Sequence, residues 1–66
     1  MDEQLYLIAK SERQLGIGLK FLYTQKIECH AIPFEMKLNR IGFKIFVNTS
    51  EERFEELRKQ FAQMIS

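Results

Sequence analysis

The sequence has few of the residues that cross-link a small protein, mark its turns or fill its core. Its 66 residues include one cysteine, one proline, three glycines and no tryptophan. The lone Cys29 excludes an internal disulfide and suits a reducing compartment. No apolar run approaches the about 20 residues that span a bilayer, and Met1–Gln4 is acidic where a secretory signal is basic. We therefore expect a cytoplasmic protein with a single domain, residues 1–66.

Neither positive nor negative charge is in excess. Ten basic and nine acidic residues give a net charge of +1, so no global field favours nucleic acid or an acidic substrate. By contrast, 45% of the residues are hydrophobic, and a chain of this length buries only about 60% of its extended surface. Apolar side chains must then remain outside, which favours a homo-oligomer or a partner.

The clearest structural signal is a strand over Gly42–Asn48. β-branched and aromatic side chains alternate there with period two, and Phe46 makes the second face partly apolar, as in a central strand. Thr49 followed by Glu52 predicts a capping box. Beyond it, apolar residues recur at spacings of three and four, which predicts an amphipathic helix. These residues are Phe54, Leu57, Phe61 and Met64 or Ile65.

A strand and a helix are predicted at the start of the chain. Residues 4–9 are apolar on both parities, so the side that faces the core stays open. Ser11 and Gln14 form a second capping-box pattern, and the leucines that follow at helical spacing predict a helix over about Glu12–Gln25.

Residues 27–38 predict a second strand with an irregularity. The apolar parity slips near Pro33, and because proline cannot donate to a ladder, we expect a bulge on an edge strand there. Asn39 and Gly42 suit positive φ in the turn that follows.

Gly16 and Gly18 fall inside the first predicted helix, where each costs about 1 kcal/mol relative to alanine. A phosphate-binding loop would need G-x-G-x-x-G or a GK[ST] ending, and neither follows these glycines. Close packing of the helix on the sheet is the favoured explanation.

The predicted order is strand, helix, strand, strand, helix. The first three elements form a right-handed crossover between parallel strands, and the third strand can pair with the second and fill the gap beside the first. The result is an α+β fold: a two-layer βαββα half-ferredoxin-like sandwich with strand order 1-3-2 and both helices on one face. Without a fourth strand, the outer edge of the first strand is open.

The sequence does not predict an enzyme. Cys29 and His30 are neighbours on a strand and point to opposite faces, whereas a nucleophile and its base must lie within hydrogen-bonding reach. One cysteine and one histidine also lack the partners of a zinc site. We assign no catalytic, metal-binding or cofactor-binding residue.

The sheet face opposite the helices should carry Phe46, either Tyr6 and Ile8 or Leu5 and Leu7, and Ile32 or Phe34. A monomer rarely leaves such a group in water. We therefore predict a small regulatory or interaction module that binds a protein partner or a small effector through an open sheet face or edge, as a homodimer. The predicted partner-binding residues are Tyr6, Ile8, Arg40, Lys44 and Phe46.

An alternative function is binding of single-stranded nucleic acid. The stretch from Lys37 to Asn48 carries Lys37, Arg40 and Lys44 and no acidic residue. Lys44 shares its parity with Phe46, and basic residues mixed with aromatics on a sheet face can stack single-stranded bases. The near-neutral net charge places this hypothesis second.

Three stretches, Gln4–Glu12, Lys26–Cys29 and Phe46–Glu52, carry a likeness to a known family. In them the chain resembles the small prokaryotic signal-transducing proteins, and the likeness extends over most of its length. The resemblance implies a βαββα half-ferredoxin-like fold and regulatory binding in place of catalysis. It implies no particular functional residue.

Overall fold

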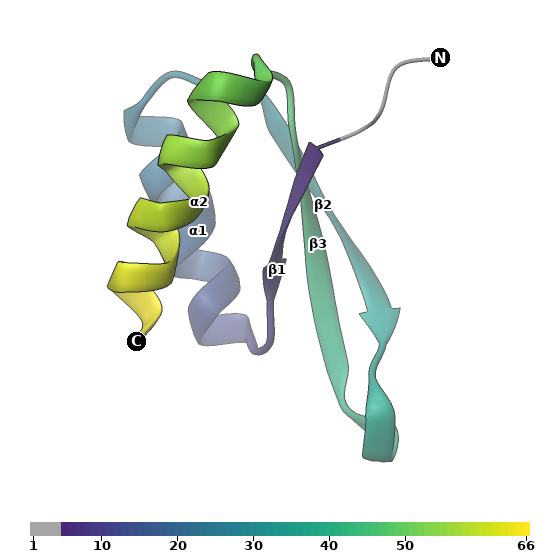
Figure 1. Cartoon of the computed structure of the whole chain (residues 1–66). Coiled ribbons are helices and arrows are strands. Elements are labelled where there is room, and N and C mark those ends of the chain that lie inside the picture. The colour runs from purple at the N-terminus through teal and green to yellow at the C-terminus, as the bar shows by residue number, and fades with distance from the viewer. Residues whose placement is uncertain (1–4) are drawn as a thin grey trace.

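The computed structural model describes residues 5–66, so the predicted strand start at Gln4 and the acidic segment Met1–Gln4 lie outside the described residues. Figure 1 shows two layers, with both helices packed on one side of a twisted sheet. No helix among residues 5–66 is long and apolar enough to cross a membrane. The elements are β1 (Leu5–Ala9), α1 (Glu12–Thr24), β2 (Cys29–Glu35), the 3₁₀ turn η1 (Lys37–Asn39), β3 (Ile41–Val47) and α2 (Glu51–Ile65).

The three strands lie in the order β1-β3-β2, and β3 pairs antiparallel with both neighbours. Because β1 and β2 are each antiparallel to β3, the two outer strands run parallel to each other, and α1 connects them. The predicted α+β class, element order, strand order and shared helix face are confirmed.

The core lies between the sheet and the helices. Leu7 and Ala9 on β1 are buried, whereas Tyr6 and Ile8 are 40% and 42% exposed. This settles the open parity of the first strand, since its odd-numbered side chains face the helices. Within residues 5–66, the buried apolar residues are Leu7, Ala9, Leu22, Ile45, Val47, Phe54, Leu57 and Phe61.

Both helices begin at a serine cap. The Ser11 hydroxyl accepts a hydrogen bond from the Gln14 amide (3.2 Å), and the Gln14 side chain accepts from the Lys10 amide (2.8 Å), so the return bond lies one residue before the predicted one.

The predicted Thr49 cap of the second helix is wrong. Ser50 is the cap, because its hydroxyl accepts from the Arg53 amide (3.2 Å) and its carbonyl accepts from the Phe54 amide (2.9 Å). Thr49 and Ser50 carry equivalent hydroxyls, and the closing of the first turn on Ser50 decides between them.

The predicted bulge at Pro33 is also wrong. The ladder between β2 and β3 is continuous from Cys29, opposite Val47, to Glu35, opposite Ile41. The strand is shorter than the predicted 27–38, and its hairpin with β3 extends past the ends of the helices (Figure 1). Beyond the helices, the helix side of the sheet has no cover, so the apolar side chains of β2 shift to the other parity there. The register of the backbone ladder does not change. The prediction that β2 is an edge strand is confirmed.

The hairpin turn uses Leu38 and Asn39 at positive φ (61° and 60°). Asn39 was predicted in this role, and Gly42 was predicted wrongly, because its φ is not positive. Gly42 is buried, and a Cβ at that position would lie 3.1 Å from the Phe34 ring and closer still to the Met36 sulfur. The glycine makes room for side chains that lie across it from β2 and the turn.

The two helical glycines have different roles. A Cβ at Gly18 would lie 2.9 Å from Ile45 Cδ1 and 3.0 Å from Phe61 Cε1, whereas a Cβ at Gly16 would meet nothing within 4 Å. The close-packing explanation therefore holds for Gly18, which lets α1 approach β3 and α2, and nothing in the structure requires Gly16.

This difference gives a matched pair of variants. Gly16→Ala should raise the free energy of unfolding by about 1 kcal/mol, since alanine favours the helix and adds no clash. Gly18→Ala gains the same propensity but should be about 1–3 kcal/mol less stable than Gly16→Ala, because the methyl group overpacks Ile45 and Phe61. Urea unfolding of both variants measures the difference, and equal stabilisation would show that the close contact is not limiting.

Candidate functional site

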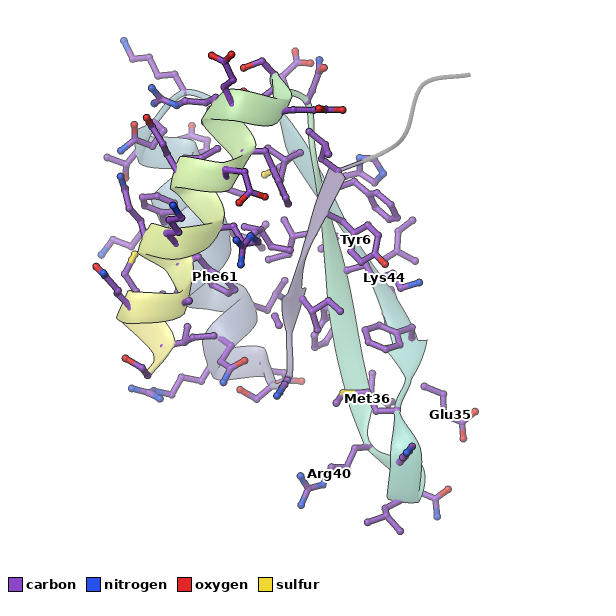
Figure 2. All side chains as sticks on the ribbon, viewed as in Figure 1. Tyr6, Glu35, Met36, Arg40, Lys44 and Phe61 are labelled. Atoms are coloured by element: carbon purple, nitrogen blue, oxygen red, sulfur yellow. The ribbon has the colours of Figure 1, made fainter. Side chains whose placement is uncertain are left out.

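The sheet has a second face, which we call the outer face, and no helix within residues 5–66 covers it. It consists of the even-numbered strand residues, which alternate with the core residues and lie opposite one another across the ladders. Figure 2 shows Tyr6 and Lys44 projecting from this side, with Phe61 on the helix side. The outer-face residues are Tyr6, Ile8, His30, Ile32, Phe34, Gly42, Lys44 and Phe46.

An aromatic row crosses the outer face from one edge of the sheet to the other. Phe46 on the central strand lies opposite both Tyr6 on β1 and His30 on β2. The Tyr6 and Phe46 ring centroids are 5.5 Å apart with the rings tilted, and the His30 and Phe46 centroids are 5.1 Å apart with the rings stacked. These separations are those of interacting aromatic pairs, so the row is a continuous ring surface.

Lys44 occupies the centre of the next row, between Ile8 and Ile32. Its Nζ lies 5.2 Å from the Tyr6 ring centroid and 5.3 Å from that of Phe34, within the range of cation–π attraction. Among residues 5–66 the recorded ion pair joins Arg58 to Glu55, and none involves Lys44. The ammonium is therefore held by ring faces and remains able to accept an anionic ligand.

The outer face is exposed although most of its side chains are apolar. Ile8 and Ile32 are 42% and 47% exposed, and within the described strands no acidic residue shares their face. Glu35 has the opposite parity on β2, and Figure 2 shows it near the hairpin end, away from Tyr6 and Lys44. The result is an apolar, aromatic surface with a single positive charge near its centre.

The structure brings together four of the five predicted partner-binding residues. Tyr6, Ile8, Lys44 and Phe46 share the outer face. Arg40 does not, because it follows the turn at the far end of the hairpin, where Figure 2 shows it extending toward the helix side of the sheet. Arg40 lies four residues before Lys44, a span of about 13 Å along the strand, so the two cations cannot hold one small anion together.

The predicted partner-binding residues include neither His30 nor Phe34, although Ile32 or Phe34 was expected on the outer face. Their parity matches that of Ile32, and this signal would have placed them on the outer face had the strand been taken as regular across Pro33. Next to Phe34 the structure also has an open hollow of ≈ 320 Å³ at the hairpin. It is lined by Pro33, Phe34, Glu35, Asn39 and Ile41.

Cys29 and His30 lie on opposite faces of β2. The Cys29 side chain packs against the core, and burial raises the pKa of its thiol, whereas His30 stacks on Phe46. A raised pKa lowers the thiolate fraction and with it nucleophilicity. Within residues 5–66, no group of three histidine, cysteine or acidic side chains is placed to hold a metal ion.

No family model, curated protein or solved structure matches this chain. The resemblance to the small prokaryotic signal-transducing proteins therefore stays a prediction, and the site is interpreted from its own geometry.

The environment of Cys29 makes a chemical prediction. At about pH 8, near the ordinary thiol pKa, iodoacetamide should alkylate the folded chain several-fold more slowly than the urea-unfolded chain, because burial keeps more of the thiol protonated. Raising the pH should speed the folded chain more than the unfolded one, since its thiol titrates later. Mass spectrometry of timed samples gives both rates, and a folded rate equal to or above the unfolded one would contradict the assignment.

Proposed function

We propose that this chain is a binding module and not an enzyme. In this proposal it is a small cytoplasmic regulatory or interaction protein that contacts a protein partner or a small effector through its outer face and assembles as a homodimer through β1. The observation that supports it best is the aromatic row of Tyr6, Phe46 and His30, over which the described part of the chain places no second layer. Lys44 supplies the charge at its centre.

Free energy favours covering the outer face. Removing apolar surface from water contributes about 25 cal/mol per Å², so covering several large side chains contributes a few kcal/mol, while small domains are stable by only about 5–15 kcal/mol. A chain that leaves such a surface exposed gains this free energy when a partner covers it. The hollow beside Phe34 (≈ 320 Å³) would admit a small effector at the hairpin.

The charge on the outer face disfavours a dimer formed face to face. Lys44 lies on the central strand, so two outer faces stacked about a two-fold axis would bring two ammonium groups together. The strand positions of the described face provide no carboxylate to pair with them, and a buried unpaired charge is costly. Self-association is better placed at a sheet edge, which leaves the outer face free for a different partner.

The two edges of the sheet differ in how well they resist pairing. On β2 the edge contains Pro33, which cannot donate to an added strand. On β1 the sequence is Leu-Tyr-Leu-Ile-Ala, without a charge or a proline, and natural edges usually carry such protection. Within residues 5–66, β1 is paired only to β3, so its other edge is available to the β1 of a second copy.

Antiparallel pairing of two β1 strands about Leu7 would preserve both faces of the sheet. Leu7 would meet its own equivalent on the helix side, and Tyr6 would lie opposite Ile8 of the second copy on the outer side. The period of two along a strand keeps core residues with core residues in this register. The dimer would carry a continuous six-stranded sheet with two outer faces side by side.

Two isoleucines provide a matched test of the edge dimer. Ile8→Lys on β1 should raise the dimer dissociation constant by at least about tenfold, since an edge lysine is a device that blocks strand pairing. Ile32→Lys on β2 should leave the dimer intact. Both residues flank Lys44 in one row and are similarly exposed, so both variants suffer the same repulsion within the chain.

Light scattering after size exclusion, over a dilution series, measures the association. The expected result is a dimer for the unmodified chain and for Ile32→Lys, with dissociation confined to Ile8→Lys. A monomer at every concentration, or equal dissociation of both variants, would rule out pairing through β1.

A further inference from the structure

The outer face has a composition that distinguishes one class of partner from the others. Aromatic rings come from all three strands: Tyr6 from β1, Phe46 from β3, and His30 and Phe34 from β2. The formal charge among these strand positions is that of Lys44, because the described acidic residues lie on helices, in loops or at the opposite strand parity. The surface therefore offers aromatic rings and a cation to whatever covers it.

The order of these groups along the strands is also specific. Lys44 lies one row from the Tyr6–Phe46–His30 row on one side and one row from Phe34 on the other. A chain laid along β3 would meet rings, then an ammonium group, then a ring. A single-stranded nucleic acid presents its groups in this alternation, because phosphates separate successive bases.

The other partner classes leave part of the surface unsatisfied. An apolar protein surface would bury Lys44 without a carboxylate, which is unfavourable. An acidic peptide would neutralise Lys44 but would have no flat groups to stack on the exposed rings. Bases stack on aromatic side chains irrespective of sequence, and phosphates pair with lysine.

We infer that the outer face binds single-stranded nucleic acid, with bases stacked on Tyr6, Phe46 and His30 and a backbone phosphate on Lys44. The inference rests on the proposed function in one respect, that the outer face is the binding surface, and it places a single-stranded nucleic acid there in place of a protein or a small effector. Since the strand residues offer no ladder of base-edge donors, the binding depends on stacking and has little sequence preference. The module is thus a stacking platform for unpaired bases.

The position of the charge also determines how binding responds to salt. Each phosphate neutralised on a single strand contributes a slope of about −0.7 to log K against log salt. With Lys44 as the cation of the face, the slope should be shallow, between about −0.7 and −1.5, and Lys44→Gln should reduce its magnitude by about 0.7. A steep slope would instead indicate diffuse attraction to many surface cations.

The closing experiment measures fluorescence anisotropy of labelled single strands of about 12 nucleotides, a length within the site size of small single-strand binders. One probe is oligouridylate, a second is oligothymidylate, and a third is an abasic strand of the same length, which keeps the phosphates and removes the bases. A labelled polyglutamate peptide tests the acidic-peptide alternative.

Two tyrosines supply the variant and its control. Tyr6→Ala should weaken binding of oligouridylate by at least about fivefold, the loss expected for removing one stacking ring. Tyr23→Ala should leave binding unchanged, because Tyr23 lies on α1 and is 85% exposed. Circular dichroism confirms folding of both, and His30→Ala provides a second test on the opposite edge strand.

The inference is supported if the base-bearing strands bind at low salt, the abasic strand binds more weakly, and the loss is confined to the outer-face variants. It is overturned if no strand binds, if the abasic strand binds equally well, or if Tyr6→Ala and Tyr23→Ala behave alike. If polyglutamate binds and responds to Lys44→Gln while the strands do not, the outer face remains a binding surface with another partner. If no probe responds to any outer-face variant, the proposed function fails with the inference.

Discussion

Both helices pack on the same face of the three-stranded sheet, so within residues 5–66 the other face has no helix over it, and this arrangement determines the rest of the molecule. The central strand β3 must serve two environments at once, with Ile45 and Val47 in the core and Lys44 and Phe46 on the outer face. Gly18 lets α1 approach Ile45 and Phe61 closely enough to close the covered side. The uncovered side is stabilised within its own layer, by aromatic pairs between strands and by the rings around Lys44.

The edges of the sheet show a related asymmetry. Pro33 weakens β2 as a template for another strand, whereas β1, which contains neither charge nor proline, has one edge that no other strand of residues 5–66 pairs with. A face with a central lysine is a poor surface for self-pairing, and an edge without protection is a good one. The edge and the face are therefore suited to different partners, and the proposal of a dimer with free outer faces follows from this division.

The predictions that held were those supported by local signals. The alternating strand and the stripe that begins at Phe54 were confirmed together with their order, because burial on one face requires those periods. Three predictions failed where one pattern has two physical causes. The parity slip near Pro33 reflects the end of the helix cover and not a bulge. Gly42 is required because Phe34 and Met36 pack against it, and not because its φ is positive. Ser50, and not the neighbouring Thr49, is the N-cap of α2.

The sequence by itself determined the elements, their order and the presence of an apolar surface beyond the core, because periodicity and composition are properties of the chain before it folds. It also indicated that Lys44 and Phe46 share a side, since they are two residues apart on one strand. Only the tertiary structure decided that Tyr6 and His30 join Phe46 in one row. It also decided that the Lys44 ammonium contacts the rings of both Tyr6 and Phe34, and that Arg40 lies apart. These outcomes depend on the register between strands distant in sequence and on how far the hairpin reaches past the helices, and neither is a local property of the chain.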